Sequence, residues 1–361
     1  MPNSTLRCTE RLFHVDLLRI LAIFLVIFNH TSDRGYMLFV DKMGSSLYFP
    51  YMTASILCKV AVPIFFMISG ALLLPKKESL GKLFSQRILR MVTILLLISV
   101  PYYAWLHRAQ GLSISNFLTY IYSNSASTSL WYLYSYIALL LMMPFLRSMV
   151  KGMKESDFQY LVWGYIAFFG IMPCLEFFLW KGHITVHYAF NPVLFMVPNI
   201  FYALVGYYLE HVLDLEKVSN KKFLVGLGVC FVALGATCFI THYQTQLLKD
   251  CTTEQVERFF NCFICIPAML LYMIMKRMCS KLRDERVKKI LPALGDAVFG
   301  IYLIEKFTRA LTDSVYVLLA PVVGAFAAAL IWVFASWSVS LIVILLLKKM
   351  PVVKNVVNRF I

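Results

Sequence analysis

Long apolar runs separated by short polar segments make up most of the chain. A transmembrane α-helix needs roughly 20 predominantly apolar residues, and several of these runs reach that length. We divide the chain into ten predicted spans, at residues 13–31, 50–75, 88–107, 129–149, 158–180, 190–213, 222–243, 258–277, 293–312 and 320–347. Because backbone groups in lipid must be hydrogen-bonded within each span, the pattern predicts an all-α membrane protein, a polytopic helical bundle of about ten transmembrane helices.

The polar segments between the runs are too short to form a soluble catalytic domain. The longest lie near residues 32–49, 108–128 and 244–257, and stretches of this size cannot enclose a core. We therefore predict a single integral-membrane domain over residues 1–361, with any chemistry among the helices. The first apolar run is followed by further ones, so we expect a span there rather than a cleavable signal peptide.

Composition and charge agree with this prediction. The 361 residues are 60% hydrophobic and 15% charged, and the net charge is +15. With a cytoplasmic N-terminus, most Lys and Arg residues fall on the cytoplasmic side, so the positive-inside rule explains the basic excess without nucleic acid. The expected location is the cell membrane, with both termini cytoplasmic. The basic residues near the chain ends and in the loops include Arg7, Lys249, Lys281, Arg283, Lys354 and Arg359.

Ionisable residues within the predicted spans are candidates for function, and we single out eight of them. They are Asp16, Arg19, His30, Lys59, Glu176, Asp296, Glu305 and Lys306. A charge at the middle of a bilayer costs at least ~2.5 kcal/mol on insertion scales, so such residues normally face the bundle interior and often mark function. At 100° per residue, Asp16, Arg19 and His30 share one face of the first helix.

Each of these three residues has two interpretations. Asp16 and Arg19, spaced i, i+3, are either a structural ion pair near the inner surface or part of a site. His30 lies about 16 Å further along the helix, in the outer half of the membrane. It is either hydrogen-bonded within the bundle or a general base, since its pKa lies near neutrality. Glu176 or Glu305, expected at similar depth, would orient its imidazole.

A basic segment, KKESLGKLFSQRILRM, follows the second predicted span. Its Arg87 and Arg90 are spaced i, i+3 at a helix start, and guanidinium forks match phosphate oxygens well. Lys76, Lys77 and Lys82 lie nearby. Positive-inside topology would also explain this charge. The C-x-x-C motif of Cys262 and Cys265 supplies fewer ligands than a metal ion usually needs, so we predict no metal site.

Five segments together resemble a known family. They are HVDLLRILAIFLVIFNH (14–30), FFMISGALLL (65–74), RILR (87–90), SLWYLYSYIALLL (129–141) and GDAVFGIYLIEKF (295–307). In this order they are similar to the integral-membrane acyltransferase family 3, whose members O-acylate surface polysaccharides, and the resemblance covers essentially the whole chain. Glu305 stands where the family frequently has a histidine, so no role of a second histidine is carried over.

The resemblance implies an acyltransferase that transfers groups other than aminoacyl groups. Its acyl donor would be cytoplasmic acyl-CoA, usually acetyl-CoA, and its acceptor a hydroxyl of a cell-surface or lipid-linked glycan. His30 would be catalytic, and the arginines of the first span and of RILR would bind the donor. The predicted residues are His30, Arg19, Asp16 and Glu305 for catalysis, and Arg87, Arg90, Arg19 and Ser69 for donor binding.

Other classes of protein remain open at this stage. The main alternative is a polytopic transporter or flippase for a glycan precursor, although the two related halves common in transporters are not visible. A membrane sensor or assembly subunit is a second alternative and would not require His30. Within the enzyme class, both direct transfer and an acyl-enzyme relay are consistent with the residues.

Overall fold

The computed structural model describes residues 11–108, 111–125, 127–247, 253–280 and 284–349. Within these ranges the regular structure is helical and no strand occurs, which confirms the all-α prediction. Arg7, Lys249, Lys281, Arg283, Lys354 and Arg359 lie outside the described residues, as do both chain ends and part of the loop predicted at 244–257.

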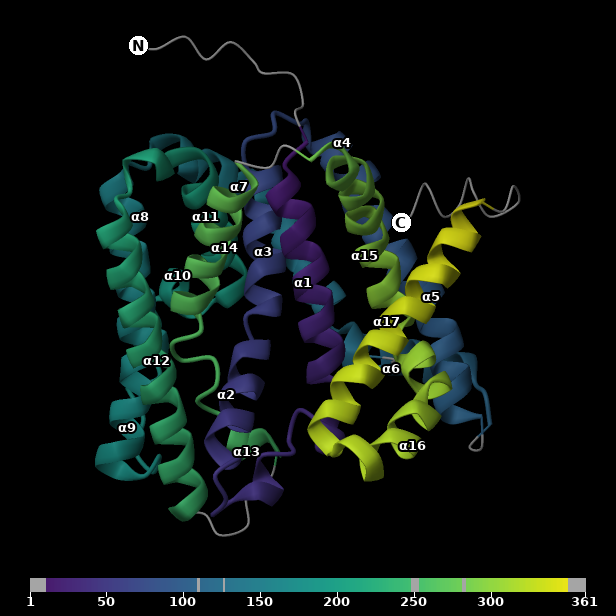
Figure 1. The fold of residues 1–361 in the computed structure, drawn as a ribbon. Helices are drawn as coiled ribbons and strands as arrows, with labels where there is room; N and C mark the ends of the chain where they lie inside the picture. Colours follow the sequence, from purple (N-terminus) through teal and green to yellow (C-terminus); the bar gives the residue numbers. More distant parts are fainter. Residues whose placement is uncertain (1–10, 109–110, 126, 248–252, 281–283, 350–361) are drawn as a thin grey trace.

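Seventeen α-helices follow one another along the described residues, and Figure 1 shows their arrangement. They are α1 (Phe13–Asn29), α2 (Tyr48–Cys58), α3 (Ala61–Leu73), α4 (Leu80–Leu83), α5 (Leu89–His107), α6 (Ile114–Ser123), α7 (Trp131–Gly152), α8 (Glu155–Tyr165), α9 (Met172–Trp180), α10 (Val193–Met196), α11 (Pro198–Tyr207), α12 (Asn220–Leu247), α13 (Thr253–Glu257), α14 (Cys265–Cys279), α15 (Glu285–Leu311), α16 (Asp313–Val323) and α17 (Ala325–Lys349).

Within the described part of the chain, six helical segments are long and apolar enough to cross a membrane. They are Tyr48–Leu73, Leu80–His107, Thr128–Gly152, Glu155–Trp180, Asn220–Leu247 and Ala325–Lys349. This result supports a multi-pass membrane protein, but the predicted count of about ten spans is not confirmed. Among the remaining predicted spans, α1 has 17 residues and α14 has 15, whereas α15 is long but rich in charged residues.

Several predicted boundaries differ from those in the structure. The span predicted at 258–277 starts in a turn, because α14 begins only at Cys265. The span predicted at 320–347 contains the end of α16 and most of α17, which are separated at Gly324. Gly324 has a φ of 85°, a backbone conformation that glycine adopts readily and that ends a helix.

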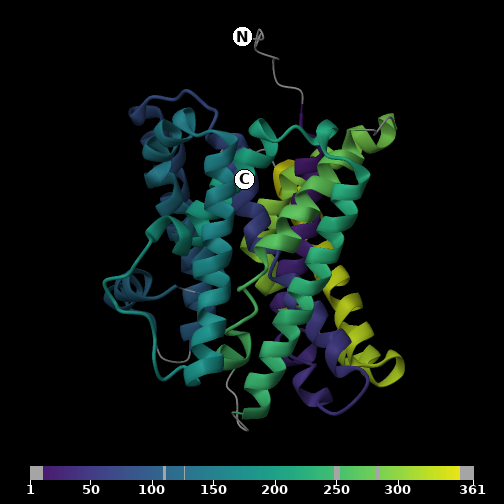
Figure 2. The same cartoon turned by 90° about the vertical axis from the view of Figure 1, so that its left-hand side faces the viewer.

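Helix α1 runs through the middle of the bundle. It packs against α3, α14, α15 and α17, and Leu18, Ala22 and Ile23 are fully buried along it. Figure 2, turned by 90°, shows the long helices running roughly parallel in that view as well. Since neighbouring helices cover α1, its ionisable residues face protein rather than lipid, which lowers the cost of keeping them in the bundle.

Helices α3 and α11 approach each other until their backbones touch. A Cβ atom added to Gly70 of α3 would overlap the backbone of Ala203, and one added to Gly206 of α11 would overlap the carbonyl group of Met67. Small residues allow such close packing between membrane helices. The contact matters for the interior of the bundle, because α3 and α11 both line the cavity described below.

We expect Gly70→Leu and Gly206→Leu to prevent formation of the native bundle. The added side chains would have to displace backbone atoms, so the loss of stability should exceed the roughly 1–3 kcal/mol typical of core overpacking. Gly228→Leu on α12 is the matched control, since nothing lies within 4 Å of a Cβ at that position. Yield of monodisperse protein in detergent and the thermal midpoint measure the effect; equal values for all three variants would contradict the assignment.

Candidate active site

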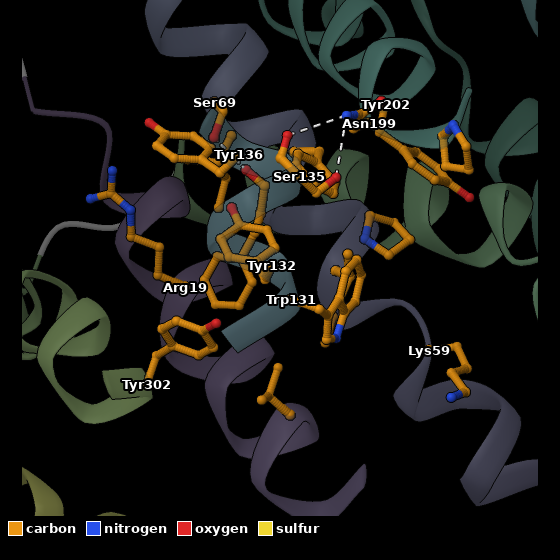
Figure 3. A pocket seen from close by; sticks show the side chains of 18 of the residues that line it. Arg19, Lys59, Ser69, Trp131, Tyr132, Ser135, Tyr136, Asn199, Tyr202 and Tyr302 are labelled. Carbon is orange, nitrogen blue, oxygen red and sulfur yellow. Dashed lines mark hydrogen bonds between the residues drawn. The ribbon is translucent and has the colours of Figure 1, made fainter. Parts of the chain in front are cut away.

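A single large cavity connects the two groups of predicted site residues. Its volume is about 1100 Å³, and its walls come mainly from α1, α3, α5, α7, α11 and α15. The predicted site residues that line it are Arg19, Ser69, Arg87, Arg90 and His30. Figure 3 shows Arg19 on one side of this space and Lys59 on the opposite side, with Tyr132 and Trp131 between them.

His30 lies at the C-terminal end of α1 and contacts a carboxylate on α15. Its Nδ1 atom is 2.9 Å from Oε1 of Glu305, whose side chain is fully buried, whereas the imidazole is 19% exposed. A carboxylate accepts the proton of Nδ1, which leaves the lone pair on Nε2. No described residue hydrogen-bonds Nε2, so this atom is available to a hydroxyl group in the cavity.

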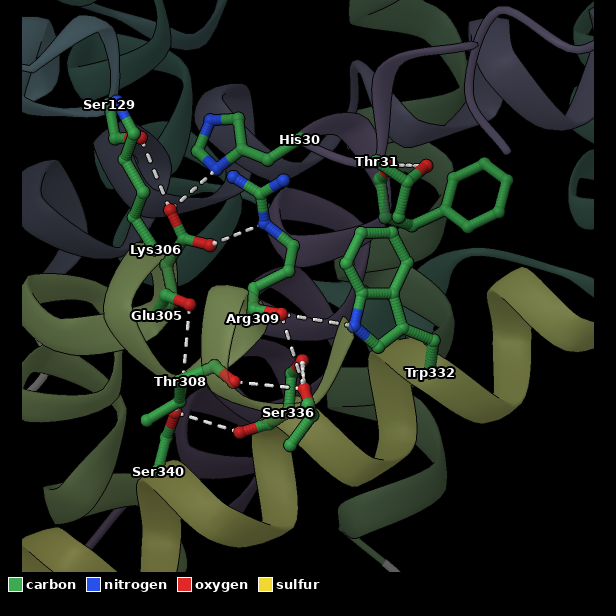
Figure 4. A network of polar contacts seen from close by, with 12 residues as sticks. His30, Thr31, Ser129, Glu305, Lys306, Thr308, Arg309, Trp332, Ser336 and Ser340 are labelled. Carbon is green, nitrogen blue, oxygen red and sulfur yellow. Dashed lines mark hydrogen bonds and ion pairs between the residues drawn. The ribbon is translucent and has the colours of Figure 1, made fainter. Parts of the chain in front are cut away.

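Glu305 is held in place by residues from two further segments. Ser129, just before α7, donates a hydrogen bond to Oε1 over 3.2 Å, and Nε of Arg309 lies 3.4 Å from Oε2. Behind it, Thr308 of α15 contacts Ser340 of α17 at 2.6 Å, and Thr312, between α15 and α16, contacts Ser336 of α17 at 2.8 Å. Figure 4 shows this network around the carboxylate. A buried carboxylate with these partners holds the imidazole in one orientation.

Asp16 lies in an ion-pair cluster near the start of α1. Its carboxylate contacts Arg19 at 3.3 Å, as the i, i+3 spacing predicted, but the shorter contact is to Nε of Arg11, at 2.7 Å. Arg11 also contacts Asp296 of α15 at 2.6 Å. Asp16 packs against Gly295, where a Cβ atom would overlap its carboxylate. The structure therefore does not bring Asp16 to His30, because Asp16 is held in this ion-pair cluster near the start of α1.

The two arginines of the RILR segment have different surroundings. Arg87 forms hydrogen bonds to both carboxylate oxygens of Glu78, the shortest being 2.5 Å. Arg147 of α7 contacts the same carboxylate at 2.9 Å and also donates to the carbonyl oxygen of Leu73. Arg90 contacts no described carboxylate, and its buried Nε atom has no hydrogen-bond partner. Arg90 is therefore the arginine of this pair that can bind an anion without first losing a partner.

The other ionisable residues have mostly local partners. Glu176 accepts a hydrogen bond from the backbone N–H of Val186, so Glu305, not Glu176, is the carboxylate beside His30. Lys59 lies at the break between α2 and α3 and pairs with Glu257 at 2.8 Å, where both residues line the cavity. Lys306 donates to Ser127.

Several residues of the site were not predicted. Ser129 and Glu78 lie within quoted segments, SLWYLYSYIALLL and KKESLGKLFSQRILRM, but nothing in their spacing indicated their partners. The sequence places Arg147 among the predicted cytoplasmic charges and Arg309 among the few predicted on the outer side, and it assigns no partner to either residue. The contacts of Arg147 with Glu78 and of Ser129 with Glu305 join residues 69 and 176 positions apart, so only the packing of the helices reveals them. Arg309 lies one helical turn from Glu305 on α15, a spacing that the sequence does show.

No group of three or more His, Cys, Asp or Glu residues suited to a metal ion occurs among the residues that the structure describes. Cys262 and Cys265 are both buried. They lie in the segment that leads into α14, among apolar side chains.

The described helices form a polytopic bundle with a histidine–carboxylate pair in its interior. The model of the acyltransferase 3 family, described as an acyltransferase domain, matches residues 13–348. The chain therefore belongs to this family and is a membrane acyltransferase. No curated protein and no solved structure matches it. The family membership confirms the resemblance found from the sequence and gives no support to a transporter, a flippase or a non-catalytic subunit.

Glu78 generates a prediction about stability and pH. Hydrogen bonds from Arg87, with a further contribution from Arg147, lower the pKa of Glu78 from 4.5 to about 2. A lowered pKa stabilises the folded state above the ordinary pKa, and this stabilisation is lost as the pH falls from about 4.5 towards 2. Glu78→Gln should therefore lower the free energy of unfolding at neutral pH by about 1–3 kcal/mol, which is measured as a lower thermal midpoint. At about pH 3 the difference in thermal midpoint between this variant and the wild type should be smaller.

Lys217 and Asp214, an exposed pair on the same predicted side of the membrane, provide the control. Asp214→Asn should change the midpoint little at either pH, because exposed ion pairs contribute little to stability. A Glu78→Gln effect of equal size at both pH values would contradict the role of the ionised carboxylate.

Proposed function

We propose that the protein is a membrane O-acyltransferase, specifically an O-acetyltransferase. It moves an acetyl group from cytoplasmic acetyl-CoA to a hydroxyl of a cell-surface or lipid-linked glycan. One observation carries this proposal: the cavity that exposes Arg90 and Arg19 also exposes His30. A donor bound at the arginine end can extend along this cavity and bring its thioester to the histidine. We place the protein in the cell membrane with both termini in the cytoplasm.

The donor end of the site would bind phosphate. Arg90 offers an unpartnered guanidinium nitrogen, and Arg19, 29% exposed at its side chain, also faces the cavity. Ser69 lines the same wall, although its hydroxyl donates to the carbonyl oxygen of Phe65. Between Arg19 and His30 the helix rises about 16 Å. The extended pantetheine arm of coenzyme A has a comparable length, so phosphates near Arg90 and a thioester near His30 are compatible.

The catalytic end would transfer a proton and an acyl group. In direct transfer, Nε2 of His30 removes the proton of the acceptor hydroxyl as its oxygen attacks the thioester carbonyl carbon. The tetrahedral intermediate then collapses, the C–S bond breaks, and the imidazolium returns its proton to the sulfur of coenzyme A. Glu305 keeps the Nδ1 proton in place and stabilises the imidazolium in each half of the reaction.

Replacement of His30 tests this assignment. His30→Ala should lower transfer of labelled acetyl from acetyl-CoA to a glycan acceptor by at least about 10²-fold, the usual contribution of a general base. Expression and folding should persist, since Glu305 retains Ser129 and Arg309 as partners. Glu305→Gln should lower kcat while leaving the KM for acetyl-CoA nearly unchanged, because the carboxylate acts through the imidazole.

His183, an exposed residue in the turn after α9, provides the matched control. His183→Ala should transfer acetyl at the wild-type rate. If His30→Ala kept wild-type activity with the same acceptor panel, His30 would not be the general base.

Arg90 should determine the affinity for the donor. Arg90→Gln removes a charged hydrogen-bond donor and should raise the KM for acetyl-CoA by roughly tenfold or more, since hydrogen bonds to charged groups contribute about 1.5–3 kcal/mol. Lys82→Gln removes a nearby exposed charge that does not line the cavity and should leave the KM unchanged. Steady-state kinetics with saturating acceptor gives the KM for acetyl-CoA of both variants. If both substitutions raised this KM equally, the general surface potential and not Arg90 itself would determine donor affinity.

A further inference from the structure

A second cavity lies next to Glu78, a residue that contacts an arginine of the first cavity. Its volume is about 680 Å³, and it is lined by the loop after α3, the second half of α7, and Tyr207 of α11. Its basic lining residues are Lys76, Lys77, Lys151 and Arg147. A cavity of this size is within the range of small-molecule sites.

One carboxylate separates this second cavity from the first. Glu78 contacts Arg87, which lines the first cavity, and Arg147, which lines the second. The contacts are 2.5 and 2.9 Å long, so the two guanidinium groups approach to within roughly 8 Å of each other. A ligand with two phosphate groups a few bonds apart is long enough to reach both cavities.

The lysines of the second cavity have no carboxylate partner. Neither Lys76, Lys77 nor Lys151 forms an ion pair with any residue that the structure describes. Burial lowers the pKa of Lys76, and nearby Arg87 adds to this effect. At the donor end of the first cavity, by contrast, Glu78 offsets Arg87 and Asp16 offsets Arg19. Most of the uncompensated positive charge therefore lies in the second cavity.

This distribution matches one feature of acyl-CoA. The molecule carries a pyrophosphate between its pantetheine arm and its nucleoside, and a separate phosphate monoester on the ribose, about four negative charges in total near neutral pH. Arg90, the uncompensated arginine of the first cavity, cannot balance this charge alone. Three unpaired lysines beyond Glu78 can bind the remaining phosphate monoester.

We infer that the second cavity binds the phosphorylated nucleoside end of the acyl-CoA donor, with Lys76, Lys77 and Lys151 around its ribose phosphate. This inference rests on the proposed function, and it adds a donor requirement. The protein would select thioesters that carry the nucleoside 3′-phosphate over shorter pantetheine thioesters. The headgroup of an anionic phospholipid presents the same phosphate chemistry at a cytoplasmic membrane surface, so the experiment includes it as a competing source.

The test compares donors that differ only in this phosphate. The triple variant Lys76→Gln, Lys77→Gln and Lys151→Gln should raise the KM for acetyl-CoA by roughly tenfold, from three exposed ion pairs of modest strength, with little change in kcat. With 3′-dephospho-acetyl-CoA, the wild type and the triple variant should have the same KM. Arg90→Gln, in contrast, should weaken both donors alike, because it acts on the pyrophosphate.

A charge-matched triple variant controls for the surface potential. Lys221→Gln, Lys222→Gln and Lys289→Gln remove the same charge from exposed positions of α12 and α15 outside both cavities, and should alter neither KM. The inference is overturned if the two triple variants behave alike, or if the Lys76, Lys77 and Lys151 variant weakens both donors equally.

Lipid vesicles distinguish the two sources of phosphate. In vesicles of phosphatidylcholine alone, a nucleotide site predicts the same discrimination between the two donors as in detergent. If the cavity bound lipid headgroups instead, addition of phosphatidylglycerol would raise the KM for acetyl-CoA of the wild type. It would not raise the KM of the Lys76, Lys77 and Lys151 variant, and the nucleotide assignment would fail. If the wild type transfers no acetyl group, only the proposed function is affected. Calorimetric titration of the wild type with coenzyme A and with 3′-dephospho-coenzyme A then tests the inference by itself. Equal affinities for the two molecules would overturn it.

Discussion

The contact between His30 and Glu305 organises the interior of the bundle. A fully buried carboxylate is costly in a membrane protein unless it is paired and hydrogen-bonded. Glu305 meets this requirement with His30 on α1, Ser129 before α7 and Arg309 one turn further along α15. Three segments far apart in sequence must therefore meet at one point. The same arrangement directs the Nδ1 atom of His30 to the carboxylate and leaves the Nε2 atom without a partner among the described residues.

The helices around the cavity pack in two different ways, through backbone atoms on one side and through large side chains on the other. Helices α3 and α11 touch through backbone atoms at Gly70 and Gly206, and this contact leaves no room for side chains between them. Towards α5, α7 and α15, larger side chains such as Tyr132 and Tyr302 line the space instead. Tyr302 also donates a hydrogen bond to the carbonyl oxygen of Ser129, which links the cavity wall to the residue that supports Glu305. The close packing of α3 against α11 thus fixes one wall of the cavity, and the large side chains towards α5, α7 and α15 line the rest of it.

The sequence was informative where the signal is local. Helical periodicity placed Arg19 and His30 on one stripe, and both line the same cavity. The i, i+3 spacing of Asp16 and Arg19 gave a real contact. Partners distant in the chain were not accessible in this way: Arg147 contacts Glu78, and Ser129 contacts Glu305. The predicted number of spans is not confirmed, because helices such as α1 and α15 are shorter or more charged than the six described segments that are long and apolar enough to cross a membrane.

Positive charge is concentrated at one end of the cavity, and this asymmetry agrees with the proposed direction of acyl transfer. At the donor end, cations outnumber their carboxylate partners, since Arg90 and the three lysines beyond Glu78 contact no described carboxylate. At the opposite end, Lys59 is paired with Glu257 and His30 with Glu305, so the charges there are balanced. In the proposed reaction, a polyanionic donor is attracted to the cationic end, and an uncharged hydroxyl is desolvated at little electrostatic cost at the other. Under the same proposal the phosphates stay with the cations, so only the neutral acyl thioester advances towards His30, over a distance that the helix geometry of α1 sets.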